Sequence, residues 1–132
     1  MNTAILAVDD DILVLNSLRI QLERKFGNDY VLEFAQNVDE AIGVIQDLRS
    51  DEIELIVIIS DWIMPGKNGD ALAQYVKQLN PAIKVVVLSG QLQETLALQM
   101  IESQEIDSIV TKPWSEDHLI GIIEQAIISK HT

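Results

Sequence analysis

The sequence has no cysteine, no long uninterrupted apolar segment and few basic residues. Without cysteine the chain can form no disulfide, no thiolate metal site and no thiol-based catalytic centre. Its apolar runs stop well short of the roughly 18 residues that a membrane-spanning helix needs. Residues 1–3 lack the positive charge and apolar stretch of a signal peptide, so we expect a cytoplasmic protein with no membrane partner.

The shortage of basic residues gives the chain a strongly acidic balance. Nine lysines and arginines stand against 21 acidic residues, which leaves a formal net charge of −12. Such a surface repels phosphate backbones, so direct nucleic-acid binding is not expected. The length of 132 residues and the hydrophobic content of 48% fit one globular domain that spans residues 1–132.

Strand-like and helix-like patterns alternate along the whole chain. Short apolar runs predict strands at residues 4–8, 30–35, 54–60, 83–88 and 106–111. The first helix carries Val14, Leu18, Leu22 and Phe26 and ends at Gly27. A second helix, capped by Asn37 or Asp39, should carry the apolar residues from Ala41 to Leu48, and a third should carry Leu72, Val76 and Leu79 and end before Pro81. Two further helices are expected over residues 93–103 and 116–129.

This alternation predicts an α/β fold. Five strand–helix units with right-handed crossovers give a doubly wound, five-stranded parallel sheet with helices on both faces. For a chain of this length we expect the flavodoxin-like strand order 2-1-3-4-5.

Chemically active side chains follow four of the predicted strands. Asp9 and Asp10 follow the first strand, Asp61 the third, Ser89 the fourth and Lys112 the fifth. Parallel strands all end on the same side of a sheet. These side chains should therefore meet in the crevice where open α/β sheets bind ligands.

The predicted cluster carries more negative charge than it can neutralise by itself. Asp9, Asp10 and Asp61 contribute three negative charges and Lys112 one positive charge, so one divalent cation would balance the set. The available ligands are oxygens, which Mg²⁺ prefers and which Mn²⁺ also accepts. The plainer interpretation is ordinary polar capping of strand ends, and Asp11 is expected to cap the first helix.

A divalent cation beside a spare carboxylate, a hydroxyl and a lysine can support phosphoryl transfer. The cation and the ammonium would stabilise the charge on the phosphoryl oxygens while a carboxylate attacks in line, which yields an aspartyl phosphate. Ser89 can donate its hydroxyl to one of those oxygens.

Four short motifs occur in the order that characterises one family. They are residues 8–10, residues 58–65 with Gly69, residues 88–90 and residues 111–113. On these motifs the chain resembles the receiver domain of two-component response regulators, the CheY-like superfamily, over nearly its whole length.

The resemblance implies specific roles at the cluster. Asp61 would be the phospho-acceptor, and Asp9 and Asp10 would hold Mg²⁺ together with Asp61 and the backbone carbonyl of Ile63. Ser89 and Lys112 would bind the phosphoryl group. The family pattern also implies a cis peptide bond between Lys112 and Pro113.

The same resemblance implies the partners. The phosphodonor would be a histidine kinase or a phosphotransfer protein, and the output would be a downstream protein or an attached output domain. Output, and a homodimer, would use the surface of helix 4, strand 5 and helix 5, on which Leu92, Leu98, Ile120 and Ile128 fall outside the expected core. Such a domain is a signalling switch and catalyses only its own phosphorylation and slow dephosphorylation.

The family pattern is not matched at every position. Ile109 stands three residues before Lys112, where most receivers carry Tyr or Phe. That aromatic ring turns inward when the switch operates. With a smaller aliphatic side chain we expect a weaker or differently routed switch.

Two other functions fit parts of the sequence. A haloacid-dehalogenase-type phosphatase would use Asp9 as nucleophile, with Ser89 and Lys112 in later motifs, but would leave the segment from Asp61 to Gly69 unexplained. An interaction module that has kept the fold and lost phosphorylation is the second alternative.

Overall fold

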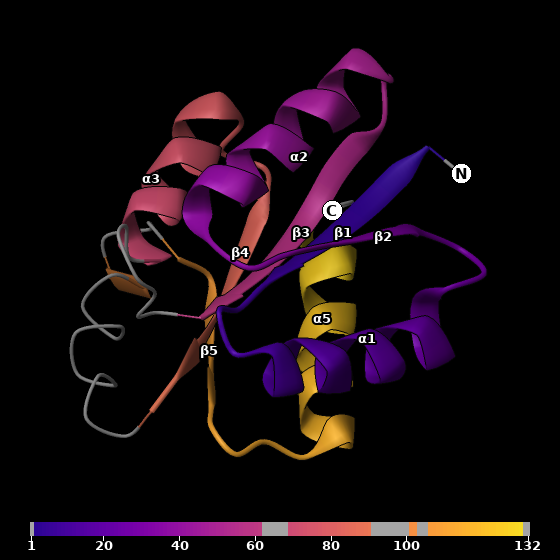
Figure 1. Cartoon of the computed structure of the whole chain (residues 1–132), viewed down its shortest axis with the longest axis vertical. Helices are drawn as coiled ribbons and strands as arrows, with labels where there is room; N and C mark the ends of the chain where they lie inside the picture. The colour runs from indigo at the N-terminus through magenta and orange to yellow at the C-terminus, as the bar shows by residue number, and fades with distance from the viewer. Residues whose placement is uncertain (1, 62–68, 91–100, 103–105, 131–132) are drawn as a thin grey trace.

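A computed structural model describes residues 2–61, 69–90, 101–102 and 106–130. Within these residues the strands are β1 (Thr3–Val8), β2 (Val31–Ala35), β3 (Glu54–Asp61), β4 (Lys84–Ser89) and β5 (Ser108–Thr111). The helices, labelled as in Figure 1, are α1 (Ile12–Phe26), α2 (Val38–Ser50), α3 (Gly69–Leu79) and α5 (Glu116–Lys130). Ile101 and Glu102 are helical, and the rest of the helix expected over residues 93–103 lies outside the described residues.

The five strands form one parallel sheet in the order β2-β1-β3-β4-β5, which confirms the predicted doubly wound topology. Helices α2 and α3 cover one face of the sheet, and α1 and α5 cover the other (Figure 1). Strands β1 and β3 are neighbours at the centre. The residues that leave their carboxyl ends are therefore brought together.

Burial on both faces explains why β3 is the most apolar stretch of the chain. Six consecutive residues of this strand are buried. Ile58 packs into the core beneath α2 and α3, whereas Ile59 packs into the core beneath α1 and α5. Each fully buried isoleucine stabilises the fold by about 1.5–3 kcal/mol. A charge inside this run would lose that stabilisation and carry a desolvation cost.

The buried stripe of α1 differs from the prediction at one position. Leu15, Leu18, Leu22 and Phe26 form the buried face, and Val14 is only half-buried. Leu15, at 3% exposure, takes the place expected for Val14. On a helix these two neighbours point about 100° apart, and the stripe from Leu15 to Phe26 is the one that faces the sheet.

Local hydrogen bonds set the helix ends. Asp11 caps α1 as predicted, because its side chain accepts a hydrogen bond of 2.9 Å from the backbone N–H of Leu13. Asn37 caps α2 by accepting from the N–H of Glu40 at 2.7 Å. Helix α1 ends before Gly27, where a Cβ atom would lie only 2.6 Å from the carbonyl oxygen of Glu23. Glycine avoids that clash.

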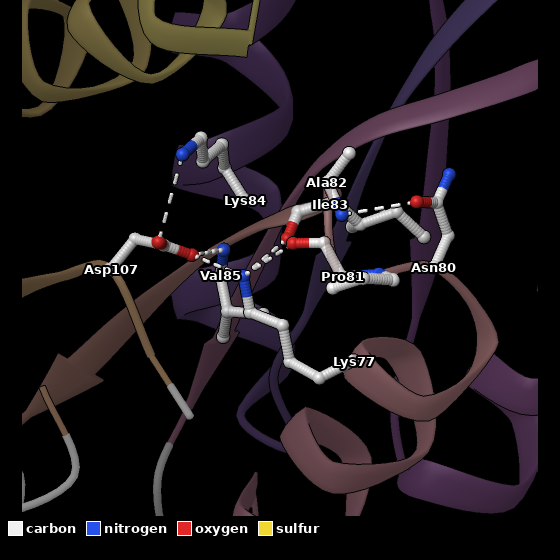
Figure 2. A network of polar contacts seen from close by, with 8 residues as sticks. All are labelled: Lys77, Asn80, Pro81, Ala82, Ile83, Lys84, Val85 and Asp107. Carbon is white, nitrogen blue, oxygen red and sulfur yellow. Dashed lines mark hydrogen bonds and ion pairs between the residues drawn. The ribbon is translucent and has the colours of Figure 1, made fainter. Parts of the chain in front are cut away.

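A polar network fastens the amino ends of β4 and β5 (Figure 2). One oxygen of Asp107 accepts from the Lys77 ammonium and from the N–H of Val85, both at 2.8 Å. Lys77 also donates to the carbonyl oxygen of Ile83 at 2.7 Å. The network joins the end of α3 to both strands. It lies at the edge of the sheet opposite Asp61, so β4 and β5 are fixed at the end away from the predicted site.

Candidate phospho-acceptor site

Three carboxylates meet at the carboxyl ends of the central strands. Asp9 and Asp10 follow β1 directly, and Asp61 is the last residue of β3. Val8 pairs with Ser60 in the sheet, so the residues that follow them are neighbours. One carboxylate oxygen from each of the three residues lies within 4.8 Å of the other two. This is the convergence that the sequence predicts.

Lys112, which follows β5, adds a positive charge to the cluster. Its ammonium nitrogen lies 3.0 Å from Oδ2 of Asp9 and 3.2 Å from Oδ1 of Asp61. The residue follows β5 directly, and its backbone N–H donates to the carbonyl oxygen of Ser89 at 2.8 Å. The Lys112–Pro113 peptide bond is cis, which confirms that prediction.

The three carboxylates experience different surroundings. Asp9 is completely buried, Asp61 has 14% of its side chain exposed, and Asp10 is exposed. The second oxygen of Asp9 accepts a hydrogen bond of 2.9 Å from the backbone N–H of Asp11. Asp9 is therefore held on both sides, while Asp10 faces solvent and can turn toward an incoming cation.

Burial and charge act in opposite directions on the two central groups. Burial raises the pKa of Asp61, the nearby charge of Asp9 raises it further, and Lys112 lowers it in part. For Lys112 burial lowers the pKa, but the hydrogen bond to Asp9 and the charge of Asp61 outweigh burial and leave the pKa raised. The negative charge of the ionised Asp61 carboxylate is thus only partly balanced by Lys112, and Lys112 stays protonated at neutral pH.

Ser89 ends β4 at the same edge. Its side chain is buried, and its hydroxyl donates to the carbonyl oxygen of Gly90 at 2.8 Å. In the sheet Ser89 pairs with Thr111, the residue before Lys112. Because Leu88, one residue earlier, pairs with Asp61, the serine lies beside the acidic cluster. A hydroxyl can rotate to donate to another oxygen at this position.

The donor set fits a hard divalent cation. The cluster offers carboxylate oxygens from Asp9, Asp10 and Asp61, and its charge, with Lys112 included, is two negative charges in excess. Mg²⁺ prefers such oxygen ligands and keeps several waters, which the exposed side at Asp10 can accommodate. The carbonyl of Ile63, expected to be a further ligand, lies outside the described residues.

The structure also shows a surface groove that was not predicted from the sequence. An open groove of about 470 Å³ adjoins Lys112 and runs between α1 and the segment after β5. Leu13, on its rim, has 74% of its surface exposed. The groove is lined by Leu13, Val14, Ser17, Gln21, Lys112, Pro113 and Trp114. A sequence signal existed in the consecutive apolar residues at the start of α1, which cannot all face the core.

The remaining expectations concern single side chains. Ile128 is 55% exposed, whereas Ile120 packs in part against the core beneath α1 and α5. Leu92 and Leu98 lie outside the described residues.

Comparison with known proteins identifies the family. The model for the response regulator receiver domain matches residues 5–124. The chain therefore belongs to the receiver domain family of two-component response regulators. Members of this family are signalling phospho-acceptors, generally non-enzymatic, that bind Mg²⁺ at an acidic pocket.

Similar proteins include transcriptional regulators. The chain is 29% identical over 125 residues to the phosphate regulon transcriptional regulatory protein PhoB of Pseudomonas aeruginosa, covering 93% of this chain and 51% of the relative. It is 30% identical over 118 residues to the transcriptional regulatory protein ResD of Bacillus subtilis, covering 89% and 45%. The chain thus spans about half the length of these two relatives. It spans only about a quarter of others, such as the hydrogenase transcriptional regulatory protein HoxA of Cupriavidus necator.

Solved receiver structures share the fold. A response regulator receiver domain protein from Clostridium thermocellum superimposes with a TM-score of 0.85 at 22% identity, covering 98% of this chain and 97% of that one. The chemotaxis response regulator CheY4 of Vibrio cholerae gives 0.77 at 22% identity, covering 96% and 99%. In the part of the chain that the structure describes, no helix is long and apolar enough to cross a membrane.

Proposed function

We propose that this chain is a phosphoryl-accepting signalling switch in which Asp61 carries the phosphoryl group. The observation that supports it best is the shared ammonium of Lys112, which lies 3.2 Å from Asp61 and 3.0 Å from the fully buried Asp9. Asp61 is the partly exposed member of this pair, and burial and Asp9 leave its charge under-compensated. Of the two carboxylates that contact Lys112, Asp61 is thus the one that an incoming electrophile can reach.

The transfer is a substitution at phosphorus. A carboxylate oxygen of Asp61 attacks the phosphorus atom and forms an O–P bond, while the bond from phosphorus to the leaving atom breaks. The bonding electron pair stays with that atom, which is an imidazole nitrogen of a histidine kinase or phosphotransfer protein, or an oxygen of acetyl phosphate. Lys112 stabilises the negative charge on the phosphoryl oxygens, and the Ser89 hydroxyl donates to one of them.

Asp9, Asp10 and Asp61 would hold Mg²⁺, with Mn²⁺ as a substitute and with the carbonyl of Ile63 as a further ligand. When bound, the ion offsets the negative charge of the phosphoryl group and of the carboxylates. Asp9 needs no rearrangement for this role, because Lys112 and the N–H of Asp11 already hold its carboxylate. The haloacid-dehalogenase alternative would instead require this fully buried carboxylate to act as the nucleophile.

The groove beside Lys112 suits the protein that donates the phosphoryl group. It opens next to the acceptor site, and the exposed Leu13 on its rim is an apolar contact of the kind that partner proteins cover. A donor bound there would hold its phosphohistidine close to Asp61. The acidic surface of the chain makes a direct nucleic-acid or membrane partner unsuitable.

Output would use the surface formed by β5, α5 and the helix expected over residues 93–103, most of which lies outside the described residues, through a downstream protein, an output domain or a second copy of the chain. On β5, Ile109 is partly buried and packs against the core beneath α2 and α3. We propose that a shift of Ser89 and Lys112 toward the phosphoryl group changes this packing, with a smaller displaced area than an aromatic side chain would give. Residues 1–132 would form one receiver domain, in a cytoplasmic protein.

The test is to locate the phosphoryl group. The chain is incubated with acetyl phosphate and Mg²⁺, the acyl phosphate is trapped by reduction, and the modified residue is found by mass spectrometry. Modification at Asp61, and none in Asp61→Asn, is the expected result. Modification at Asp9 would favour the phosphatase. A chain that is not modified, and that binds Mg²⁺ only weakly or not at all, would favour the phosphorylation-independent module.

A further inference from the structure

The segment that carries Lys112 is fastened to α1 by two side-chain contacts. Nε1 of Trp114 donates a hydrogen bond of 2.9 Å to Oε1 of Gln21. Arg24, one turn further along α1, donates to both carboxylate oxygens of Glu116 at 3.1 Å. Figure 1 shows α1 and α5 on the same face of the sheet, and the connection from β5 leads to the start of α5.

Lys112 needs this support because its strand provides little. Within the part of the chain that the structure describes, β5 has four residues and is an edge strand bonded to β4 alone. Lys112 lies just past its end, and among the described residues its backbone N–H donates to the carbonyl oxygen of Ser89 at 2.8 Å. A lysine side chain is long and flexible, so a fixed backbone limits the positions that its ammonium samples and favours the one between Asp9 and Asp61.

The other end of α1 is attached to the same acidic cluster. Asp11 caps this helix, and its backbone N–H donates to Oδ1 of Asp9. The helix therefore begins at the carboxylate that Lys112 must reach, and at Gln21 it holds the segment that positions Lys112. Asp9, α1, the Gln21–Trp114 bond and Lys112 form a closed ring of contacts. A rigid helix in this ring fixes the distance between its two ends.

We propose that Gln21 is a positioning residue for phosphoryl transfer to Asp61. By accepting the hydrogen bond from Trp114 it holds the segment after β5, and thereby keeps the Lys112 ammonium between Asp9 and Asp61. The proposal rests on the function proposed above. Without the acceptor, the indole N–H turns to solvent in the groove, the segment relaxes and Lys112 spends less time in place. We expect phosphorylation to slow by about three- to tenfold, which is the rate change that corresponds to the free energy of one lost hydrogen bond.

The experiment compares Gln21→Met, which keeps the length and removes the amide acceptor, with Gln21→Glu, which keeps an acceptor oxygen. Trp114→Phe removes the donor and keeps an aromatic ring. Lys25→Met is the matched control, because it breaks another contact between α1 and α5, the exposed Lys25–Glu124 pair at 3.6 Å. Acetyl phosphate is the phosphodonor, so that docking of a donor protein in the groove plays no part. The rate of Asp61 modification is measured with saturating Mg²⁺, and urea unfolding gives the stability of each variant.

The proposal predicts slower modification in Gln21→Met and in Trp114→Phe, no further slowing in the double variant, and a rate near the parental one in Gln21→Glu. The NMR signals of the Lys112 side chain should shift in the slow variants only. Lys25→Met should keep the parental rate even at equal loss of stability. Parental rates in both Gln21→Met and Trp114→Phe would overturn the proposal, as would slowing in proportion to lost stability with unshifted Lys112 signals. If the parent chain itself is not modified at Asp61, the proposed function fails instead.

Discussion

Replacement of Lys112 by methionine tests the electrostatic account of the site most directly. Methionine has nearly the length of the lysine side chain and no charge, so Asp9 loses its counter-ion while the packing is largely kept. Asp9 is completely buried, and among its described contacts it keeps the hydrogen bond from the N–H of Asp11. The variant should therefore be less stable than the parent when no metal ion is present.

The size of the loss follows from the geometry. At an effective dielectric constant of about 20, unit charges at the observed 3.0 Å attract each other by about 5.5 kcal/mol. The desolvation of Lys112, which the variant avoids, offsets part of this. Breaking a buried ion pair by removing one partner costs about 3–5 kcal/mol. Because 26% of the Lys112 side chain is exposed to solvent, we expect a smaller loss of about 2–3 kcal/mol.

The assay is urea unfolding at neutral pH, in the presence of a chelator and again in excess Mg²⁺. The midpoint should fall in chelator while the slope stays unchanged, because the surface exposed on unfolding is the same. Mg²⁺ should stabilise Lys112→Met more than the parent, since the ion replaces the missing positive charge. Binding at a hundred times the dissociation constant stabilises a fold by about 2.7 kcal/mol, which is enough to restore most of the loss.

Lys25→Met provides the matched control. Its ion pair with Glu124 spans 3.6 Å between side chains that are about half exposed, and such pairs contribute about 0–1 kcal/mol. A loss in Lys112→Met no larger than that in Lys25→Met would refute the reasoning. It would mean that water or rearrangement compensates Asp9 as well as the ammonium does.

Three further outcomes test other parts of the structure. Asp61→Asn should be more stable than the parent at neutral pH in chelator. Because burial raises the pKa of Asp61 above 3.8, the folded parent binds a proton at this residue more tightly than the unfolded chain does. The stability advantage of Asp61→Asn should therefore shrink as the pH falls through the raised pKa. A stability advantage that grows on acidification would contradict this. Ser89→Ala should slow acetyl-phosphate labelling by about ten- to hundredfold, with Ser89→Thr near the parental rate, and equal rates in all three would rule out the hydroxyl's role. Asn37→Ala should lower the free energy of unfolding by about 1 kcal/mol through loss of the α2 cap and leave labelling unchanged; a slower rate would show that α2 contributes to the site.

Much of the architecture was predictable because its causes are local. The apolar run that became β3 is buried on both faces, and such runs, separated by helix-period segments, define a parallel α/β sheet. Parallel strands deliver their following residues to one edge, so the meeting of Asp9, Asp61 and Lys112 also followed from order along the chain. The burial of Leu15 rather than Val14 on α1 was not predictable, because both residues are apolar and the orientation of the helix decides which of them faces the sheet.

The sequence by itself determined the fold, the family motifs and the set of residues at the site, since spacing and residue type carry that information. Only the tertiary structure decided how those residues differ from one another. Asp9 is buried and paired with Lys112, while its neighbour Asp10 faces solvent. It also decided the bond between Gln21 and Trp114, which lie 93 positions apart. Contacts of this kind depend on how a helix and a loop approach in space, and no periodicity in the chain encodes that approach.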